Sequence, residues 1–539
     1  VLISFPAVLS AQTIKGDVLV SGDGAPVDYK IPEGIREIAP NAFATSSVRS
    51  VQCPASLEVI GQCAFFYAVD LKSVTFAPNS KLRVIGEQAF SDCTNLETIE
   101  LPNSIDSIGT NAFVLCENLK KVTIPTGLKK LSRSTFMSCS NLMKVKFPET
   151  LKEIDETCFA NCVSLTSLTL TGVETIGERA FYNCKVLTNV KLNEGLKEIK
   201  DNAFQRCVAL ETLELPASVE KTGAKLFLQC PEFSGFTVVA GSTHMMTADG
   251  VLYSKDKTTL YECPQTLKSD NFVVPAETKL IRSMAFFECQ DIKAITLPAN
   301  LEKVGTGALS NNGMALFNFT TNNYMVHEDN ALYYRSTTGK GLYLIAVPCK
   351  GTKTEFMLQP KTSYVADYAF SYNNNVQKIY LPDSVVGIGE RAFYACHGLK
   401  DIYSYRKTAP TLGEEVFGDV EFNKVYLHVR KGSEKSYADN NWLFLWGDNI
   451  EGDYPAVADG INGVVTVGSV LSVIRQSETE VRIIADKTIG SVELYNTSGA
   501  LISISKPLGS NEIVLTLPHC GVYVAKLRLA DGSIKVVKI

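Results

Sequence analysis

The chain has 539 residues and a formal net charge of −5, and 45% of its residues are hydrophobic and 20% charged. This balance excludes wholesale disorder, and the weak acidic charge argues against a dedicated nucleic-acid-binding protein, which carries a basic stripe. A chain of this length is normally divided into several domains, unless repeats extend one core along an axis.

The first twelve residues, VLISFPAVLSAQ, form an apolar run that ends in small residues before the polar stretch QTIKGD. This pattern is typical of the end of a secretory signal, here residues 1–11, followed by an N-terminal segment at 12–29; the alternative is a hydrophobic first strand. No later apolar run reaches the length of about eighteen residues that a membrane-spanning helix needs. We expect an exported chain, secreted or at the cell surface, without a membrane span.

A short phrase, seen as AFYNC at Ala180–Cys184, recurs along most of the chain. Its aromatic position repeats every 22 to 25 residues, apart from two longer gaps. A fixed period in this range indicates a solenoid of stacked units. The fourteen residues at this position are Phe43, Phe65, Phe90, Phe113, Phe136, Phe159, Phe181, Phe204, Phe227, Phe286, Leu309, Phe370, Phe393 and Phe417.

Each unit predicts two short strands. In residues 95–116, NLETIELPNSIDSIGTNAFVLC, the apolar Leu96, Ile99 and Leu101 are interleaved with polar residues, and Pro102 ends the segment. One buried face and a terminal proline are typical of a short strand that stops pairing there. A second extended piece follows, and the AF segment then turns the chain inward. Stacking would place parallel strands about 4.8 Å apart.

Two insertions, near residues 237–275 and 317–360, interrupt the period. Asp249-Gly250 and Asp329-Asn330 each precede an apolar run with tyrosine, and such pairs favour β-hairpin turns because they accept positive φ. We therefore expect a solenoid over residues 30–424 that carries two hairpins, and not separate inserted domains.

The pattern changes after the last repeat. Residues 425–454 hold both tryptophans, Trp442 and Trp446, and we expect this segment to cap the open end of the stacked core. Residues 455–539 alternate apolar and polar residues between turn signals such as Asp531-Gly532, which predicts a small antiparallel β-sandwich.

The repeat resembles the BspA-like (TpLRR-type) leucine-rich repeat of bacterial surface proteins. Its pattern C-x-x-L-x-x-[IV]-x-[LF]-P, followed by [IL]-G-x-x-A-F, is met by Cys93, Leu96, Ile99, Leu101, Pro102, Ile108, Gly109, Ala112 and Phe113. The resemblance covers about residues 30–450 and implies a right-handed coil with parallel strands. Departures from the Cys or Phe position occur at Ser46, Ala68, Asn312, Asn373 and Leu309.

The C-terminal segment resembles the sorting domain of the type IX secretion system of Bacteroidetes. The matching pieces are VELYNTSGAL at Val492–Leu501, GVYVAKL at Gly521–Leu527 and the final IKVVKI. A generic β-sandwich stalk is the alternative. Proteins with this combined architecture are adhesins that bind host or bacterial surface proteins, so the resemblance implies such a role.

Nine of the fifteen cysteines stand at one repeat position, three residues after the aromatic residue or its equivalent. No C-x-x-C motif occurs, so zinc spacing is absent. Stacked cysteines fall within disulfide distance, but equivalent side chains point in parallel and nine cannot all pair, which favours buried free thiols. These nine are Cys93, Cys116, Cys139, Cys162, Cys184, Cys207, Cys230, Cys289 and Cys396.

No residue pattern indicates catalysis. The five histidines are scattered without a neighbouring nucleophile, and the repeated carboxylates after the IG motif lack the asymmetry of a glycosidase pair. The string GIGERA, Gly387–Ala392, is the repeat phrase with a chance glycine and indicates no nucleotide site. We expect no catalytic residue, no metal and no cofactor.

The outward strand positions are the candidates for partner binding. Eight basic residues lie between Cys116 and Lys152, against two acidic ones. Interfaces favour tyrosine anchors and complementary charge, although a solvated face is the common meaning of such rows. The candidate residues are Lys121, Lys144, Lys146, Lys191, Tyr380 and Tyr403.

We therefore expect a non-catalytic adhesin, secreted or at the cell surface, that binds a protein or glycan partner. The protein partner would be a component of the host extracellular matrix or another bacterial surface protein. The alternatives are an envelope scaffold without a host ligand and an envelope hydrolase.

Overall fold

The computed structural model describes residues 13–336, 341–421, 424–440, 442, 450–454, 464–466, 471–475, 480–485, 487–496, 501–506, 509–517, 523–530 and 534–538. The predicted signal remnant, Trp446, Cys520 and the Asp531-Gly532 turn lie outside these residues. The chain forms two compact units. The first comprises the residues up to Leu427 together with Ser436–Ile450, and the second comprises His428–Lys435 and Glu451–Ile539.

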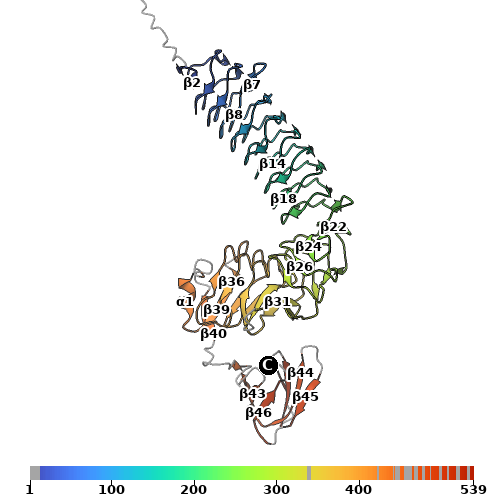
Figure 1. Cartoon of the computed structure of the whole chain (residues 1–539). Coiled ribbons are helices and arrows are strands. Elements are labelled where there is room, and N and C mark those ends of the chain that lie inside the picture. Colours follow the sequence, from blue (N-terminus) through green and yellow to red (C-terminus); the bar gives the residue numbers. More distant parts are fainter. Residues whose placement is uncertain are drawn as a thin grey trace, which may run out of the picture. The chain divides into compact units, whose positions relative to one another are not determined.

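The first unit is a parallel β-solenoid in which successive coils contribute short strands to two stacks (Figure 1). The first stack contains β3 (Asp28–Lys30), β5 (Ser50–Cys53), β7 (Ser73–Phe76), β9 (Thr98–Ile99), β11 (Lys121–Thr123), β13 (Lys144–Lys146), β15 (Ser167–Thr169), β17 (Asn189–Lys191), β19 (Thr212–Leu215), β21 (Gly235–Val238), β25 (Phe272–Val273), β27 (Ala294–Thr296), β29 (Leu316–Asn318), β33 (Glu355–Met357), β35 (Lys378–Leu381) and β37 (Asp401–Ser404). The predicted solenoid of parallel strands is therefore confirmed.

The second stack holds the other short extended piece of each unit, which the sequence also predicts. Its strands are β2 (Val18–Ser21), β4 (Glu37–Ile38), β6 (Val59–Ile60), β8 (Val84–Ile85), β10 (Ser107–Ile108), β12 (Lys130–Leu131), β14 (Glu153–Ile154), β16 (Thr175–Ile176), β18 (Glu198–Ile199), β20 (Lys221–Thr222), β24 (Thr259–Glu262), β26 (Leu280–Ile281), β28 (Lys303–Val304), β32 (Leu342–Ala346), β34 (Thr362–Val365), β36 (Gly387–Ile388) and β38 (Thr411–Leu412). The N-terminal β1 (Thr13–Lys15) pairs antiparallel with β2 at the start of this stack.

The AF segment forms the inner corner of each coil. The Phe113 N–H donates to the Thr135 C=O of the next coil at 2.8 Å, and the same bond recurs along the stack. Residues two before and two after the aromatic position adopt positive φ, as at Asn111 (58°) and Leu115 (59°). This conformation is unfavourable for most residues, but the ladder of backbone hydrogen bonds between coils offsets it. From Phe43 to Phe227 the rings stack with centroids 4.9 to 5.7 Å apart.

The glycine of the IG motif lies where successive coils approach most closely. A Cβ atom on Gly109 would stand 2.5 Å from the backbone nitrogen of Glu87 in the preceding coil. Real Cβ atoms do not tolerate such a distance, so only glycine permits this stacking.

Both insertions are β-hairpins, as the sequence predicts. In the first, β22 (Met245–Ala248) and β23 (Val251–Ser254) pair antiparallel, and β23 pairs antiparallel with β24. In the second, β30 (Met325–Glu328), β31 (Ala331–Arg335) and β32 repeat this arrangement. The turn residues Asp249, Gly250, Asp329 and Asn330 have φ of 51°, 77°, 57° and 59°.

Each hairpin interrupts the first stack. We call the interruption between β21 and β25, where β22 to β24 are inserted, the first gap, and that between β29 and β33, where β30 to β32 are inserted, the second gap. At the first gap the Phe236 N–H donates to Gly250 C=O at 3.1 Å. At the second gap the Phe317 N–H donates to the Asn330 Oδ1 at 2.9 Å. Each hairpin turn thus covers the free edge of the strand that precedes it.

The end of the first unit is closed by aromatic side chains near α1 (Glu434–Asp439), which follows β39 (Tyr426–Arg430). The Tyr437 hydroxyl donates to Ser404 Oγ at 2.7 Å, and the indole N–H of Trp442 donates to Pro410 C=O at 3.0 Å. The Trp442 ring lies edge-on to Phe417, with centroids 6.0 Å apart. In the described parts of the chain, no helix has the length and apolar character needed to cross a membrane.

The second unit contains two antiparallel sheets that share one core. Their orders are β41-β42-β43-β46 and β45-β44-β47-β48. Side chains of β43, β44, β46 and β47 form the common core, as expected of a β-sandwich. The strands, with β40 before them, are β40 (Ile450–Tyr454), β41 (Val464–Thr466), β42 (Leu471–Arg475), β43 (Glu480–Ala485), β44 (Ile489–Asn496), β45 (Leu501–Ser505), β46 (Glu512–Thr516), β47 (Tyr523–Leu529) and β48 (Ile534–Lys538).

Candidate interaction surface

Three of the predicted lysines lie together on the first stack. Lys121 of β11 and Lys144 of β13 are directly opposite each other in a parallel, in-register pair. Lys146 lies two residues further along β13, and all three side chains are exposed. Their strands keep this orientation because the intervening Val122 and Val145 are buried in the core. We call Lys121, Lys144 and Lys146 the lysine face.

Four of the other five basic residues of this region are neutralised by carboxylates of the described residues, and Lys129 is the exception. Lys120, Lys130, Arg133 and Lys152 form ion pairs with carboxylates, most of them one coil away. Among the residues that the structure describes, none forms an ion pair with the lysine face. The positive charge that remains unneutralised in this region is therefore that of the three residues of the lysine face and of Lys129, and not of all eight basic residues. The carboxylates of these pairs belong to Glu97, Glu153, Asp155, Glu156 and Glu174.

The remaining predicted residues lie elsewhere on the first stack. Lys191 is exposed on β17, which pairs with β15 in a separate two-stranded sheet where Lys191 is opposite Thr169. Tyr380 of β35 is opposite Tyr403 of β37, and their rings stack with centroids 4.7 Å apart and planes 10° apart. The structure thus brings together Lys121, Lys144 and Lys146 as one group and the two tyrosines as another.

The nine repeat cysteines are buried and free. The Cys116 thiol donates to the Phe90 C=O of the preceding coil at 3.2 Å, and the equivalent bond recurs for most of the others. Cys289 instead lies 3.7 Å from Pro264 C=O. Burial raises the pKa of the thiols of Cys93, Cys116, Cys139, Cys162, Cys184, Cys207, Cys230 and Cys396. A protonated, enclosed thiol is a poor nucleophile, so this row is part of the core.

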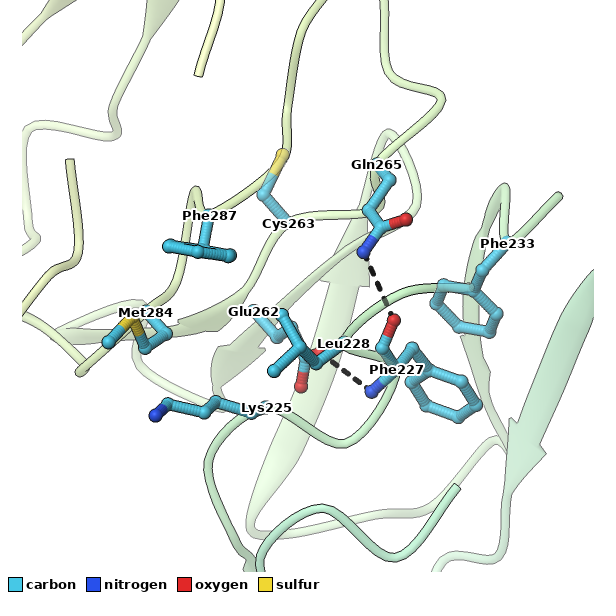
Figure 2. A pocket seen from close by; sticks show the side chains of 9 residues that line it. All are labelled: Lys225, Phe227, Leu228, Phe233, Glu262, Cys263, Gln265, Met284 and Phe287. Carbon is cyan, nitrogen blue, oxygen red and sulfur yellow. Dashed lines mark hydrogen bonds between the residues drawn. The ribbon is translucent and has the colours of Figure 1, made fainter. Parts of the chain in front are cut away.

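Polar side chains converge at the first gap (Figure 2). The Glu262 carboxylate accepts the backbone N–H groups of Leu226 and Phe227, both at 3.1 Å. The Gln265 side-chain amide donates to the Phe227 C=O at 3.2 Å. Burial raises the pKa of Glu262 to about 7 and lowers that of nearby Lys225. The void among these side chains is about 10 Å³, which holds one water at most, so they join two parts of the core and leave no room for a ligand.

The sequence analysis does not predict this contact of Glu262 with Leu226 and Phe227. The signal that could have marked it is a glutamate at an otherwise apolar strand position.

The described histidines also remain apart. The His397 Nε2 atom lies 3.2 Å from the Asp419 Oδ2 atom of the neighbouring coil. No group of three His, Cys, Asp or Glu side chains that could hold a metal ion occurs in the described part of the chain.

Known proteins share this repeat. The sequence model of the BspA type leucine rich repeat region matches residues 27–142, 65–172, 152–247, 257–340 and 349–441. A search of curated proteins gives no match.

Several solved structures are similar. A leucine-rich cell surface protein from Faecalibacterium prausnitzii A2-165 is 23% identical, with 72% of this chain and 90% of that chain covered and a TM-score of 0.41. A leucine-rich repeat protein from Bacteroides ovatus ATCC 8483 is 18% identical, with 78% and 90% covered and a TM-score of 0.41. The T. pallidum leucine-rich repeat protein TpLRR is 27% identical, with 30% and 90% covered and a TM-score of 0.25.

The family matches span most of the solenoid, and the coils carry the repeat in their buried Leu, Ile, Ala and Phe positions. The chain belongs to the BspA-type leucine-rich repeat family.

Proposed function

We propose that the chain is a secreted or cell-surface adhesin that binds a protein partner through the lysine face without catalysis. The observation that carries this proposal is the register of Lys121 with Lys144 and the absence, among described residues, of a carboxylate paired with either. Rigid strands hold these charges in place, so a partner gains complementary contacts without ordering a loop.

The chemistry of the lysine face favours an acidic partner. Its charges stand on adjacent strands, about 4.8 Å apart at the backbone, in a chain whose overall charge is −5. Exposed charges interact over about 8 Å at physiological ionic strength, so binding should weaken as salt is added. Paired lysines such as Lys130 already have carboxylate partners and would contribute less.

Pull-down with purified host matrix proteins, in parallel with bacterial-surface extracts, tests this function and separates a host adhesin from an envelope scaffold. The triple charge reversal of Lys121, Lys144 and Lys146 to Glu should abolish capture. A matched control reverses three other exposed lysines of the solenoid, Lys185, Lys200 and Lys221, and should preserve it. Capture that survives the first triple variant would refute the lysine face, and turnover in a broad hydrolase screen would overturn the non-catalytic assignment.

We further propose that the second unit directs the chain to the cell surface. The segment Val492–Leu501 spans β44 and the start of β45, and Tyr523–Leu527 lies on β47, while residues 497–500 and 521–522 fall outside the described residues. The resemblance of these segments to the type IX sorting domain supports the proposal. Cell-surface labelling with and without the residues beyond Tyr454 tests it, because display that persists without them contradicts a sorting role.

A further inference from the structure

The strand β33 has a free edge inside the solenoid. It is the first strand of its sheet and pairs only with β35. The Leu358 N–H donates to Tyr380 C=O of β35 at 3.1 Å. Because backbone groups alternate sides along a strand, the N–H and C=O of Glu355 and Met357 point the other way, into the second gap.

The hairpin turn caps only the opposite side of this gap. The Asn330 side chain donates to Ala315 C=O and accepts from Phe317 N–H, both at 2.9 Å, and so replaces a neighbouring strand for β29. In the described residues, no backbone or side-chain group pairs with the outward edge of Glu355 and Met357.

This free edge has only part of the usual protection against pairing, because Glu355 is charged and exposed but Met357 is not charged. Natural edge strands commonly carry charges that discourage another strand from adding. The edge strand β3 follows that rule with exposed Asp28 and Lys30. Met357 stands at the position of β33 that corresponds to Lys30, and its side chain is apolar and 42% exposed.

A cavity lies beside the free edge because one repeat leucine is absent. In a regular coil Leu119 stands three residues before the central strand residue Val122 and is buried. The coil of β33 has Lys353 at that position, before Phe356, and its ammonium group pairs with Asp329 at the hairpin turn. A cavity of about 110 Å³ remains, in which Val347, Pro348, Phe356 and Val376 form an apolar wall and Asp329, Asn330, Thr352, Lys353 and Asn373 form a polar one.

We propose that the second gap is a strand-addition site, in which an extended segment of a partner polypeptide pairs with β33 and places an aliphatic side chain in the cavity left by the missing leucine. An extended backbone is the ligand whose alternating C=O and N–H groups match those of Glu355 and Met357. The cavity is smaller than an apolar cavity of about 150 Å³, which accepts a benzene ring, and its apolar wall suits a branched aliphatic side chain. Side chains of the added strand would also contact Met357 and Tyr380, which are neighbours on one face.

This site goes beyond the lysine face and does not depend on it. A phage-displayed library of linear heptapeptides, panned against the full chain, supplies the probe, and the enriched peptides are then synthesised. We expect these peptides to carry an aliphatic residue between β-branched residues. On binding, hydrogen exchange at the Glu355 and Met357 amides should slow at least tenfold.

Two variants test the two halves of the site. Met357→Pro removes an outward N–H and leaves the bonds to β35 intact, so peptide affinity should fall at least tenfold. Lys353→Leu restores the repeat leucine and fills the cavity, so it should raise the melting temperature and abolish peptide binding. Val273→Pro, at the corresponding outward position of β25, is the matched control and should leave the affinity unchanged.

The outcomes are distinct. The proposal is overturned if no peptide is enriched on the wild-type full chain relative to the Lys353→Leu variant. It is also overturned if the peptides bind the Met357→Pro and Lys353→Leu variants as tightly as the wild type. Amide protection that appears without peptide and grows with protein concentration identifies a second copy as the occupant and also overturns it. If the Met357→Pro variant does not fold, the loss or retention of peptide binding in the Lys353→Leu variant decides whether the site exists. The lysine-face charge reversal should not change peptide binding, so this site and the proposed function can fail separately.

Discussion

The carboxylate of Glu262 accepts the backbone N–H of Phe227 at 3.1 Å, in a position that a backbone carbonyl occupies elsewhere. In the preceding coil the Phe204 N–H donates to Leu226 C=O at 3.1 Å. Because of the first insertion, no regular coil directly follows that of Phe227 in the sequence. The Glu262 side chain of β24 supplies the hydrogen-bond acceptor that such a coil would provide. The solenoid thus remains continuous at the first gap through a buried ionisable group.

Stability should depend on pH through Glu262. Burial raises its pKa from 4.5 to about 7 in the folded chain, so between these values the folded state holds a proton that the unfolded state has lost. The contribution to the free energy of unfolding is complete below pH 4.5 and disappears as the pH rises through 7, with a total of about 3 kcal/mol at most. Melting temperatures measured from pH 5 to pH 8 should therefore decline.

The variant Glu262→Gln isolates this effect because it cannot titrate, so its melting temperature should change less over the same pH range. Burial also raises the pKa of Glu288, which leaves some decline in the variant. Glu220→Gln, at an exposed position of the preceding coil, should retain the full decline. Parallel curves for the wild type and Glu262→Gln would show that Glu262 does not carry the effect.

The aromatic stack should make a large local contribution to stability. Phe136 is fully buried between Phe113 and Phe159, at centroid distances of 5.2 and 5.4 Å. Phe136→Ala should lower the free energy of unfolding by about 3–5 kcal/mol if the coil cannot collapse around the cavity. Phe136→Leu should lower it less, since Leu309 naturally occupies this repeat position.

Hydrogen exchange measures this effect coil by coil, because stability in a solenoid is largely a sum of neighbouring interactions. We expect faster exchange in the coils on both sides of Phe136 and little change beyond the first gap. A uniform change along the whole solenoid would contradict a local effect.

The sequence predicts the solenoid well because its core positions repeat. Leu96, Ile99 and Phe113 are identifiable by spacing alone, and Asp329-Asn330 marks a hairpin by its turn propensity. Ion pairing is harder to predict. The carboxylate of Glu174 pairs with Lys152 from the next coil, so the net charge of a short sequence segment does not show which of its lysines are neutralised.

The repeat pattern also does not predict the hydrogen bonds that Glu262 and Asn330 form at the two gaps. Glu262 and Asn330 replace backbone partners that the insertions remove, so their roles depend on bonds between segments far apart in the sequence. The substitution of the repeat leucine by Lys353 is visible in the sequence, but the cavity it leaves depends on where the hairpin turn lies.

The repeat cysteines should be unreactive in the native chain and reactive after denaturation without a reductant. They are buried and free, and burial raises the pKa of thiols such as Cys139, so little thiolate is present near pH 8. Alkylation followed by mass spectrometry measures each site. Cys63 is partly exposed and should be modified first, as an internal control. Cysteines linked as disulfide-bonded peptides in the unreduced digest would contradict free thiols.

Asn330 should be the residue on which the second hairpin depends most. It combines a φ of 59° with two hydrogen bonds to β29, through Ala315 C=O and Phe317 N–H. Asn330→Gly keeps the conformation and loses both bonds, and should lower the free energy of unfolding by about 1–3 kcal/mol. Asn330→Ala loses the bonds and also strains the turn, for about 1 kcal/mol more. Asn330→Asp keeps the acceptor for Phe317, so exchange of the Phe317 amide should stay slow in this variant alone, and equal exchange in all three would show that the side chain does not cap β29.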